Sequence, residues 1–301
     1  MSGRIVSVRH LYRCPLRWAD MDALGHVNNV RYVDYLQEAR VDLLRLHGRS
    51  ALGEELAEGI VVVQHDIEFT APLSYRAAPV SIESWVTEIR AATFTLAYEI
   101  FDEVDGERHV YARATTILSP FVFSAGRPRR LEGKEKELLS RFLEPTPGNG
   151  AAASGAGTHA PPEDGTATAV EPHRYECNVR WSDVDAYGHV NNVMYFEYFQ
   201  EARIMAMVDA VPLEERDAFV VARVVVDYRR PLLFRAEPYD IETRATRIGR
   251  SSFTLEAIIL DDADRLAVAR ATVVAFDPET QRSRPLQPAE VDGLRRILTA
   301  S

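Results

Sequence analysis

One polar segment of this chain occurs twice, once in each half. The two copies read RWADMDALGHVNN at residues 17–29 and RWSDVDAYGHVNN at residues 180–192. Each copy leads into a largely apolar segment that starts with Val and ends with Glu-Ala-Arg, at residues 30–40 and 193–203. A repeat of this length indicates two copies of one folding unit.

The repeat extends beyond this segment and divides the chain. Shorter matching segments occur at residues 76–79 and 235–238, at 94–96 and 253–255, and at 112–115 and 269–272. Between the halves, residues 145–165 carry no large apolar side chain and cannot bury enough surface to offset the entropy lost on ordering. We therefore predict an N-terminal domain over 1–144, a flexible linker over 145–171 and a C-terminal domain over 172–301.

Composition narrows the possible functions. The net charge of -10 argues against nonspecific nucleic-acid binding, which needs a basic face. No apolar run is long enough to span a bilayer, and the first residues lack the apolar region of a secretory signal, so we predict a cytoplasmic protein with no membrane partner. The two cysteines, Cys14 and Cys177, are too few for a disulfide framework and are predicted to be small core residues.

Apolar periodicity predicts the elements of the first half. Val6 to Trp18 is expected to form a strand, and Asn28 to about His47 a helix that Gly48 closes with a left-handed cap. Four further strands and a short helix are expected, at residues 60–70, 80–89, 93–101 and 110–121 and at 131–143.

The second half repeats this order, with strands near Val220, Tyr239, Phe253 and Ala267 and a last helix from about Ala289 to Leu298. The long helix of the first half is apolar on several sides, so it must be enclosed. The fold class predicted is α+β: two modules, each an antiparallel sheet curled around a long helix. Because one module leaves a sheet edge exposed, we expect the two to pair within the chain.

The repeated motif resembles that of a known enzyme family. The pattern Asp-x-Asp-x-x-Gly-His-Val-Asn-Asn-x-x-Tyr, followed by Glu-Ala-Arg, is similar to that of hotdog-fold thioesterases of the 4-hydroxybenzoyl-CoA thioesterase type and to that of plant acyl-ACP thioesterases, which are double hotdogs. The resemblance implies hydrolysis of an acyl thioester, an acyl-CoA or an acyl-ACP, where two hotdogs meet, without a cofactor. It assigns the catalytic carboxylate to Asp22 and Asp185, as general base or as nucleophile.

Other residues of the motif fit this chemistry. Negative charge that develops on a thioester oxygen is stabilised by backbone N–H groups at a helix start, and the amides of Asn29 and Asn192 are the predicted donors. His26 and His189 are predicted to orient the carboxylates or contact the substrate, or else only to bond the backbone. Predicted substrate-binding residues come from the same segment in both copies: Gly25, Gly188, Asn28, Asn191, Tyr32 and Tyr195.

Several residues near the motif are expected to have structural rather than catalytic roles. Asp20 and Asp183 are expected to be structural, and Glu38 and Glu201 to pair with arginines, with a catalytic role held in reserve. Asp20, Asp22 and His26 could form a metal set, but no further ligand lies nearby in the sequence, so no metal is predicted.

Three function classes stay open at this stage: a thioesterase, a noncatalytic acyl-CoA-binding module, and a hotdog enoyl hydratase or dehydratase. The absence of a large basic docking run in the sequence favours small-molecule CoA thioesters over acidic carrier proteins. Both copies keep the Asp, Gly, His and Asn-Asn set, so two working sites with different acyl preferences are expected. Leu36 against Phe199 is one of the exchanges that would set this difference. Assembly into a further homo-oligomer stays open.

Overall fold

The computed structural model describes residues 8–52, 59–144, 171–211, 219–277, 279–280 and 282–298. Residues 145–170 of the predicted linker lie outside these ranges. The first half comprises β1 (His10–Cys14), η1 (Trp18–Asp20), α1 (Asn29–Leu52), β2 (Ile60–Phe69), β3 (Val80–Ile89), β4 (Phe94–Val104), β5 (Glu107–Val122), η2 (Phe123–Ala125), β6 (Arg127–Pro128) and α3 (Gly133–Ser140).

The second half repeats the same order of elements. It comprises β7 (His173–Cys177), η3 (Trp181–Asp183), α4 (Met194–Ala210), β8 (Phe219–Tyr228), β9 (Tyr239–Ile248), β10 (Ser252–Asp261), β11 (Asp264–Asp277), β12 (Arg282–Ser283) and α5 (Pro288–Arg295). The predicted order of strands and helices is therefore observed in both halves.

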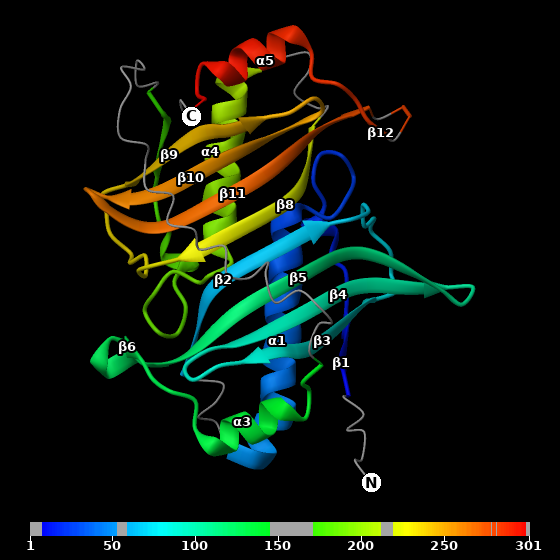
Figure 1. Ribbon diagram of the computed structural model, residues 1–301, viewed down its shortest axis with the longest axis vertical. Helices are drawn as coiled ribbons and strands as arrows, with labels where there is room; N and C mark the ends of the chain where they lie inside the picture. Colours follow the sequence, from blue (N-terminus) through cyan, green and yellow to red (C-terminus); the bar gives the residue numbers. More distant parts are fainter. Residues whose placement is uncertain are drawn as a thin grey trace.

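The strands form one large antiparallel sheet (Figure 1). Its main path runs β1-β3-β4-β5-β2-β8-β11-β10-β9-β7, and the halves join where β2 pairs with β8. Both central strands have a register shift at an equivalent residue, Val63 or Ala222. Three residues further on, Asp66 pairs with Val225, so two counterparts face each other. A pseudo-twofold axis therefore passes between β2 and β8.

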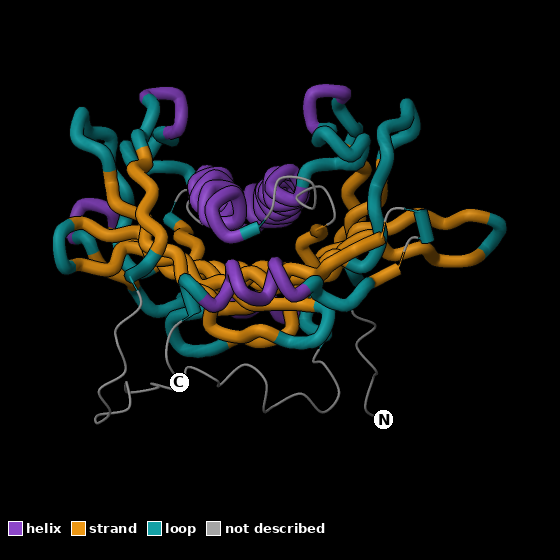
Figure 2. The backbone as a smooth tube through the Cα atoms, turned by 90° about the horizontal axis from the view of Figure 1, so that it is seen from above, coloured by secondary structure: helices purple, strands orange, loops and turns teal. Residues whose placement is uncertain are grey.

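The two long helices lie next to each other on the concave side of the curved sheet (Figure 2). The buried residues of α1 recur every three or four positions and include Val30, Val33, Leu36, Ala39 and Leu43, each at most 2% exposed. They belong to a hydrophobic cluster that also contains Ile67 of β2 and Val226 of β8, so the two halves share one core. In the described ranges, no helix is both long and apolar enough to cross a membrane.

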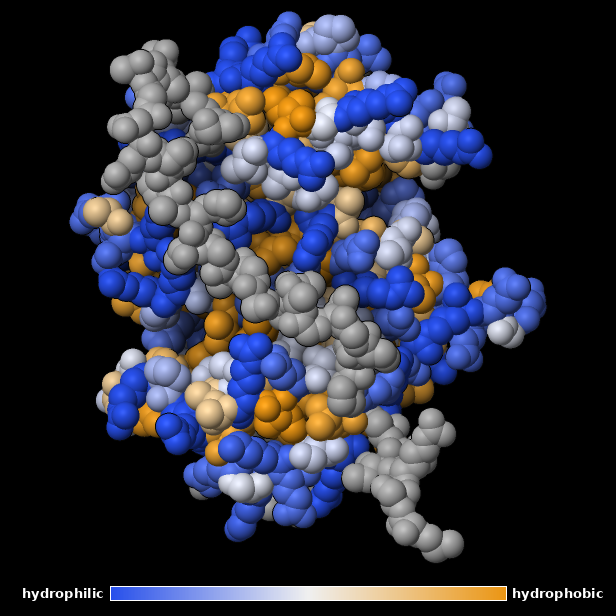
Figure 3. All heavy atoms as spheres, viewed as in Figure 1, coloured by the Kyte–Doolittle hydropathy of each residue, from blue (hydrophilic) through white to orange (hydrophobic). Residues whose placement is uncertain are grey.

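The outer face of the sheet carries many hydrophilic side chains interspersed with hydrophobic ones (Figure 3). Cross-strand ion pairs include Glu99 with Arg113 and Glu256 with Arg270, both at 2.9 Å. Asp66 and Arg223 form a pair of parallel hydrogen bonds across the junction between β2 and β8. The junction therefore combines a shared apolar core with polar contacts on its outer side.

Two boundary predictions were wrong. The first helix does not end at Gly48 but continues to Leu52, because one glycine inside a helix costs only about 1 kcal/mol relative to Ala and the residues that follow include good helix formers. Of the predicted strand from Val6 to Trp18, residues 6–7 lie outside the described ranges, and β1 spans His10–Cys14 of the rest, since Pro15 follows and has no N–H to donate to a neighbouring strand.

The match between residues 112–115 and 269–272 is two residues out of register. Phe94 pairs with Leu118, whereas its counterpart Phe253 pairs with Val273. The true counterpart of 112–115 is therefore 267–270. The β10–β11 hairpin turns earlier than the β4–β5 hairpin, so both of its strands are shorter. A shift of two residues along a strand leaves the same set of side chains facing inward, so the two segments resemble each other in sequence although they are not structural counterparts.

Candidate functional site

A buried carboxylate organises each copy of the motif. In the first copy, Asp20 is 3% exposed and accepts hydrogen bonds from Arg17 Nε at 3.0 Å and from the Tyr35 hydroxyl at 2.6 Å. Its backbone oxygen accepts the N–H of Asn28 at 2.8 Å. Burial raises the pKa of Asp20, but the hydrogen bonds from Arg17 and Tyr35 outweigh burial and hold that pKa below its usual value. These contacts give Asp20 a structural role.

The second copy is built in the same way. Asp183 accepts from Arg180 Nε at 3.1 Å and from the Tyr198 hydroxyl at 2.6 Å, and its backbone oxygen accepts the N–H of Asn191 at 2.9 Å. Every partner lies in the same half of the chain as the carboxylate. Each half therefore folds its own motif.

Asp22 begins a tight turn whose shape requires glycine. Its Oδ1 accepts the N–H groups of Leu24 at 2.9 Å and His26 at 3.2 Å, while its backbone oxygen accepts the Gly25 N–H at 3.1 Å. Gly25 has φ +76°, and Gly188 in the second copy has φ +78°. A Cβ at Gly25 would meet nothing within 4 Å, so the backbone angle, and not a close approach, accounts for glycine here.

The helix start presents a free amide beside this turn. Asn28 Oδ1 accepts the N–H of Val30 at 2.9 Å, which is an N-cap contact. Asn29 follows as the first helical residue, and the hydrogen bonds of the described residues include none from its backbone N–H. In the second copy, Asn191 Oδ1 likewise accepts from Val193 at 3.0 Å, although α4 itself begins at Met194. The geometry leaves an N–H donor available at each helix start.

The predicted histidines and tyrosines differ in their surroundings. The Tyr195 hydroxyl accepts the N–H of Leu232 at 2.7 Å and is buried, so it fixes the chain beside the motif. His189 lies 6.0 Å, between ring centroids, from Phe123 of the first half, and Phe123 stacks on Tyr187 at 4.5 Å. His26 is half-buried, and its backbone N–H bonds Asp22. Sequence reasoning missed Phe123, because nothing in its own segment connects it with the second motif.

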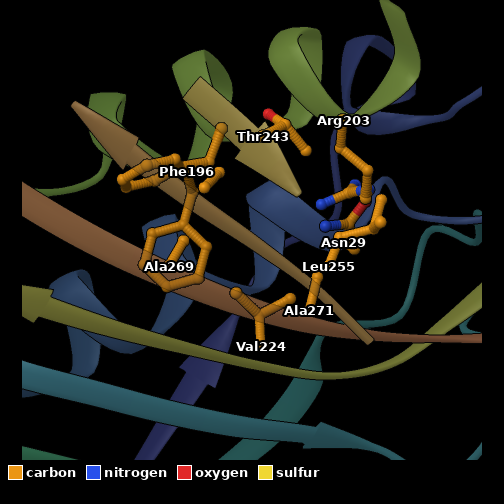
Figure 4. Close-up of a pocket in the computed structure, with 10 residues that line it drawn as sticks. Asn29, Phe196, Arg203, Val224, Thr243, Leu255, Ala269 and Ala271 are labelled. Carbon is orange, nitrogen blue, oxygen red and sulfur yellow. The ribbon is translucent and has the colours of Figure 1, made fainter. Parts of the chain in front are cut away.

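A narrow, mostly apolar pocket joins the first motif to the second half (Figure 4). Asn29 is its residue from the first half. All others come from α4 and the strands of the second half: Phe196, Phe199, Arg203, Val224, Thr243, Leu255, Ala257, Ala269 and Ala271. Figure 4 shows Arg203 next to Asn29, with Phe196 and Ala269 at the other end. Tyr32 is not among the residues that line this pocket.

Several other candidates play no part in this pocket. Cys14 and Cys177 are buried, as predicted, and burial raises the pKa of both thiols to about 12. Neither thiol therefore supplies a thiolate near neutral pH. Across the described ranges, no cluster of His, Cys, Asp and Glu could hold a metal ion.

The reserve glutamates do not pair as expected. Glu38 and Glu201 are exposed, and neither forms an ion pair with another described residue. Arg31 of α1 instead bridges the helices by pairing with Glu197 of α4 at 2.9 Å. Glu197 follows the second motif by only five residues, so the two helix starts are held together at the centre of the molecule.

Comparison with known proteins gives a consistent family. The model of the thioesterase-like superfamily matches residues 16–141 and again residues 179–294. The long-chain acyl-CoA thioesterase FadM of Escherichia coli (strain K12) is 29% identical over 118 residues, which is 37% of this chain and 89% of FadM. An uncharacterised Bacillus subtilis (strain 168) protein, YsmA, is 35% identical over 83 residues, 26% of this chain and 54% of its own length.

Solved structures resemble nearly the whole chain. A protein assigned as an oleoyl thioesterase from Lactobacillus plantarum superposes with a TM-score of 0.68 at 16% identity and covers 90% of this chain and 98% of its own. The 12:0-ACP thioesterase from Umbellularia californica gives 0.65 at 15% identity, with 93% and 97% covered. At these identities the likeness establishes the fold, which is of the hotdog thioesterase type.

Proposed function

Since the chain belongs to the thioesterase-like superfamily and hydrolyses acyl thioesters, we propose that its substrates are acyl-CoAs and that it works as two hotdog modules paired within one chain. The modules would be residues 1–144 and 172–301, joined by the linker 145–171. The repeated order of elements and the pseudo-twofold pairing of β2 with β8 support this arrangement.

The observation that carries the site assignment is the pocket itself. Its lining residue from the first half is Asn29, seven residues after Asp22, and the rest of the lining lies in the interior of the second half; Asp22 itself does not line the pocket. The cavity is small, about 10 Å³, so the side chains that line it would move to admit an acyl chain. The thioester carbonyl would then lie at the Asn29 N–H, which would bind the oxyanion together with the positive end of α1. The apolar lining, which includes Phe196, Leu255 and Ala269, favours an aliphatic acyl group.

The proposed reaction is hydrolysis with Asp22 as general base. One oxygen of Asp22 is held by two N–H groups, which orients the carboxylate and leaves the other oxygen for the reaction. Asp22 takes a proton from water, the hydroxide oxygen bonds to the carbonyl carbon, and the C–S bond breaks. The departing thiolate takes up the proton, so water and thioester become acid and thiol.

Direct attack by Asp22 is the alternative route and gives the same products. A single turnover in ¹⁸O-labelled water that puts label into Asp22 would establish the direct-attack route. Label appears in the Asp22 side chain only if an acyl-enzyme anhydride forms and water then attacks the carbonyl of Asp22.

CoA is favoured over carrier proteins as the thiol carrier. The FadM relative is an acyl-CoA thioesterase by name, and this acidic chain would repel an acidic carrier protein. The preference is measured as kcat/KM for one acyl group presented on CoA and on a carrier protein.

The test of the proposed function is the double variant Asp22→Asn plus Asp185→Asn. Asparagine keeps the size of aspartate and its Oδ1 acceptor but cannot take a proton, so we expect thioester hydrolysis to fall by about 10²- to 10⁴-fold. Release of free thiol from acyl-CoAs gives the rate, and thermal unfolding verifies that the variant is folded. A folded double variant with near wild-type activity would refute the assignment of these carboxylates.

A further inference from the structure

The two interiors of the molecule differ at equivalent positions. In the second half, three small or slim side chains line the pocket: Val224, Ala257 and Ala271. Val224 lies two residues after the register shift in β8, and His65 lies two residues after the corresponding shift in β2. His65 is therefore the counterpart of Val224, with an imidazole in place of an isopropyl group.

The other two counterparts are larger as well. Ala271 pairs with Val224 and Leu255, and in the first half Thr116 pairs with His65 and Leu96 in the same way. Tyr98 lies four residues after Phe94, as Ala257 lies four residues after Phe253. Three positions that line the pocket in the second half therefore carry a tyrosine, a histidine and a threonine in the first.

These larger side chains are fully packed. Tyr98 and His65 are each 1% exposed and Thr116 is 0% exposed. Thr116 Oγ1 lies 2.8 Å from His65 Nδ1, and the Tyr98 hydroxyl lies near Thr116 and the buried Arg40. At these three positions, protein atoms occupy space in the first half that the smaller side chains of the second half leave open.

This cluster also holds the second helix start. His65 Nε2 accepts from the Asn192 side-chain amide at 3.3 Å, and the Tyr228 hydroxyl donates to the Asn192 backbone oxygen at 2.9 Å. At the first helix start, Asn29 instead faces Val224, which cannot form a hydrogen bond. The side chain of Asn192 is thus hydrogen-bonded to His65, whereas the side chain of Asn29 faces the pocket.

We propose that the chain has one acyl-binding site, in which Asp22 and Asn29 act on an acyl chain inserted into the second half, and that Tyr98, His65 and Thr116 exclude acyl chains from the site of Asp185 and Asn192. This inference rests on the proposed function and replaces the sequence-based expectation of two working sites. It makes Ala257 and Tyr98 the positions that determine which site accepts an acyl chain.

The first experiment compares single and double variants. Asp22→Asn alone is expected to lower kcat/KM by about 100-fold or more for every saturated acyl-CoA, to the level of the Asp22→Asn plus Asp185→Asn variant. Titration calorimetry with a non-hydrolysable S-alkyl-CoA thioether is expected to give one bound ligand per wild-type chain. Half of the activity left in Asp22→Asn, or two ligands per chain, would overturn the inference. A wild-type protein inactive on all acyl-CoAs would instead refute the proposed function.

The second experiment opens the closed interior. In the Asp22→Asn background, Tyr98→Ala with His65→Val gives the first half the residues of the second at these positions. We expect this variant to bind a second thioether ligand per chain and to regain measurable hydrolysis. Tyr98→Phe in the same background is the matched control, because it keeps the ring and should restore nothing. A folded opened variant that still binds one ligand would show that these side chains do not close the site.

Discussion

His65 is a titratable group buried in the closed interior, and it predicts a specific loss of stability in mild acid. Burial lowers the pKa of His65 well below its usual value, and the charge of Arg40 lowers it further. Its other neighbours are uncharged: Thr116 and Asn192 through hydrogen bonds, and the rings of Phe196 and Tyr228. The folded protein therefore keeps His65 neutral over a pH range in which the unfolded chain protonates it.

The size of the effect follows from proton linkage. The unfolded chain takes up a proton at His65 below about pH 6.5, whereas the folded chain does not, so the stability from neutral His65 is complete above that pH. It is lost as the pH falls towards the folded-state pKa. Each pH unit below 6.5 over which only the unfolded chain is protonated costs about 1.36 kcal/mol, so the wild type loses up to about 2 kcal/mol of unfolding free energy from this residue between pH 7 and pH 5.

The variant His65→Val removes this titration and introduces the residue of the second half. Urea unfolding at pH 7 and at pH 5 should show that the wild type loses about 2 kcal/mol more than His65→Val over this interval. Thr116→Val is the control, because it removes the hydrogen-bond partner but keeps the imidazole, and it should retain the wild-type pH dependence. Equal pH dependence in the wild type and His65→Val would refute the burial of a neutral His65.

Two further predictions concern the motif and the linker. Tyr35→Phe removes the hydroxyl that bonds buried Asp20 and should cost about 1.5 to 3 kcal/mol of unfolding free energy at pH 7, with a similar loss for Tyr198→Phe in the second half. Because the folded-state pKa of Asp20 is lowered, this contribution is complete above the unfolded pKa of about 3.9 and is lost as the pH falls through the folded value, so urea unfolding in strong acid should show a smaller difference. Cutting the chain within residues 145–168 should leave two fragments that elute together on size exclusion, since β2 pairs with β8 and the halves share one core. Fragments that elute separately would contradict this pairing.

The sequence predicts the elements well where periodicity and composition act locally. The expected strand at residues 80–89 has the observed bounds of β3, since the segment is rich in β-branched and aromatic residues that partly alternate with polar ones. The end of the first helix was wrong, because a single glycine is a weak signal against helix-forming neighbours. The misplaced match at 269–272 arose because an even shift along a strand changes pairing without changing the buried face.

In the candidate site too, the sequence predicts the local features but not the contacts between distant segments. The turn of Asp22 and Gly25 and the cap of Asn28 are local, and the spacing of the motif predicts them. The pocket is not local, since Asn29 and Val224 belong to different halves and meet only when β2 pairs with β8. His65 and Val224 both lie in apolar strands, and only the register shows that they are counterparts. Phe123 is hidden from the sequence for the same reason.

Each motif belongs to one half of the chain but lies against the interior of the other half. Each motif is held by contacts within its own half, such as Tyr35 with Asp20 and Tyr198 with Asp183 at the same 2.6 Å. Each motif faces an interior that belongs to the other half, as Asn29 faces Val224 and Asn192 faces His65. A substitution in one interior therefore acts on the helix start of the opposite half, as His65 contacts Asn192, while the buried carboxylate of that motif keeps the partners of its own half. A single chain can thus hold two intact motifs and still present only one of them to a substrate.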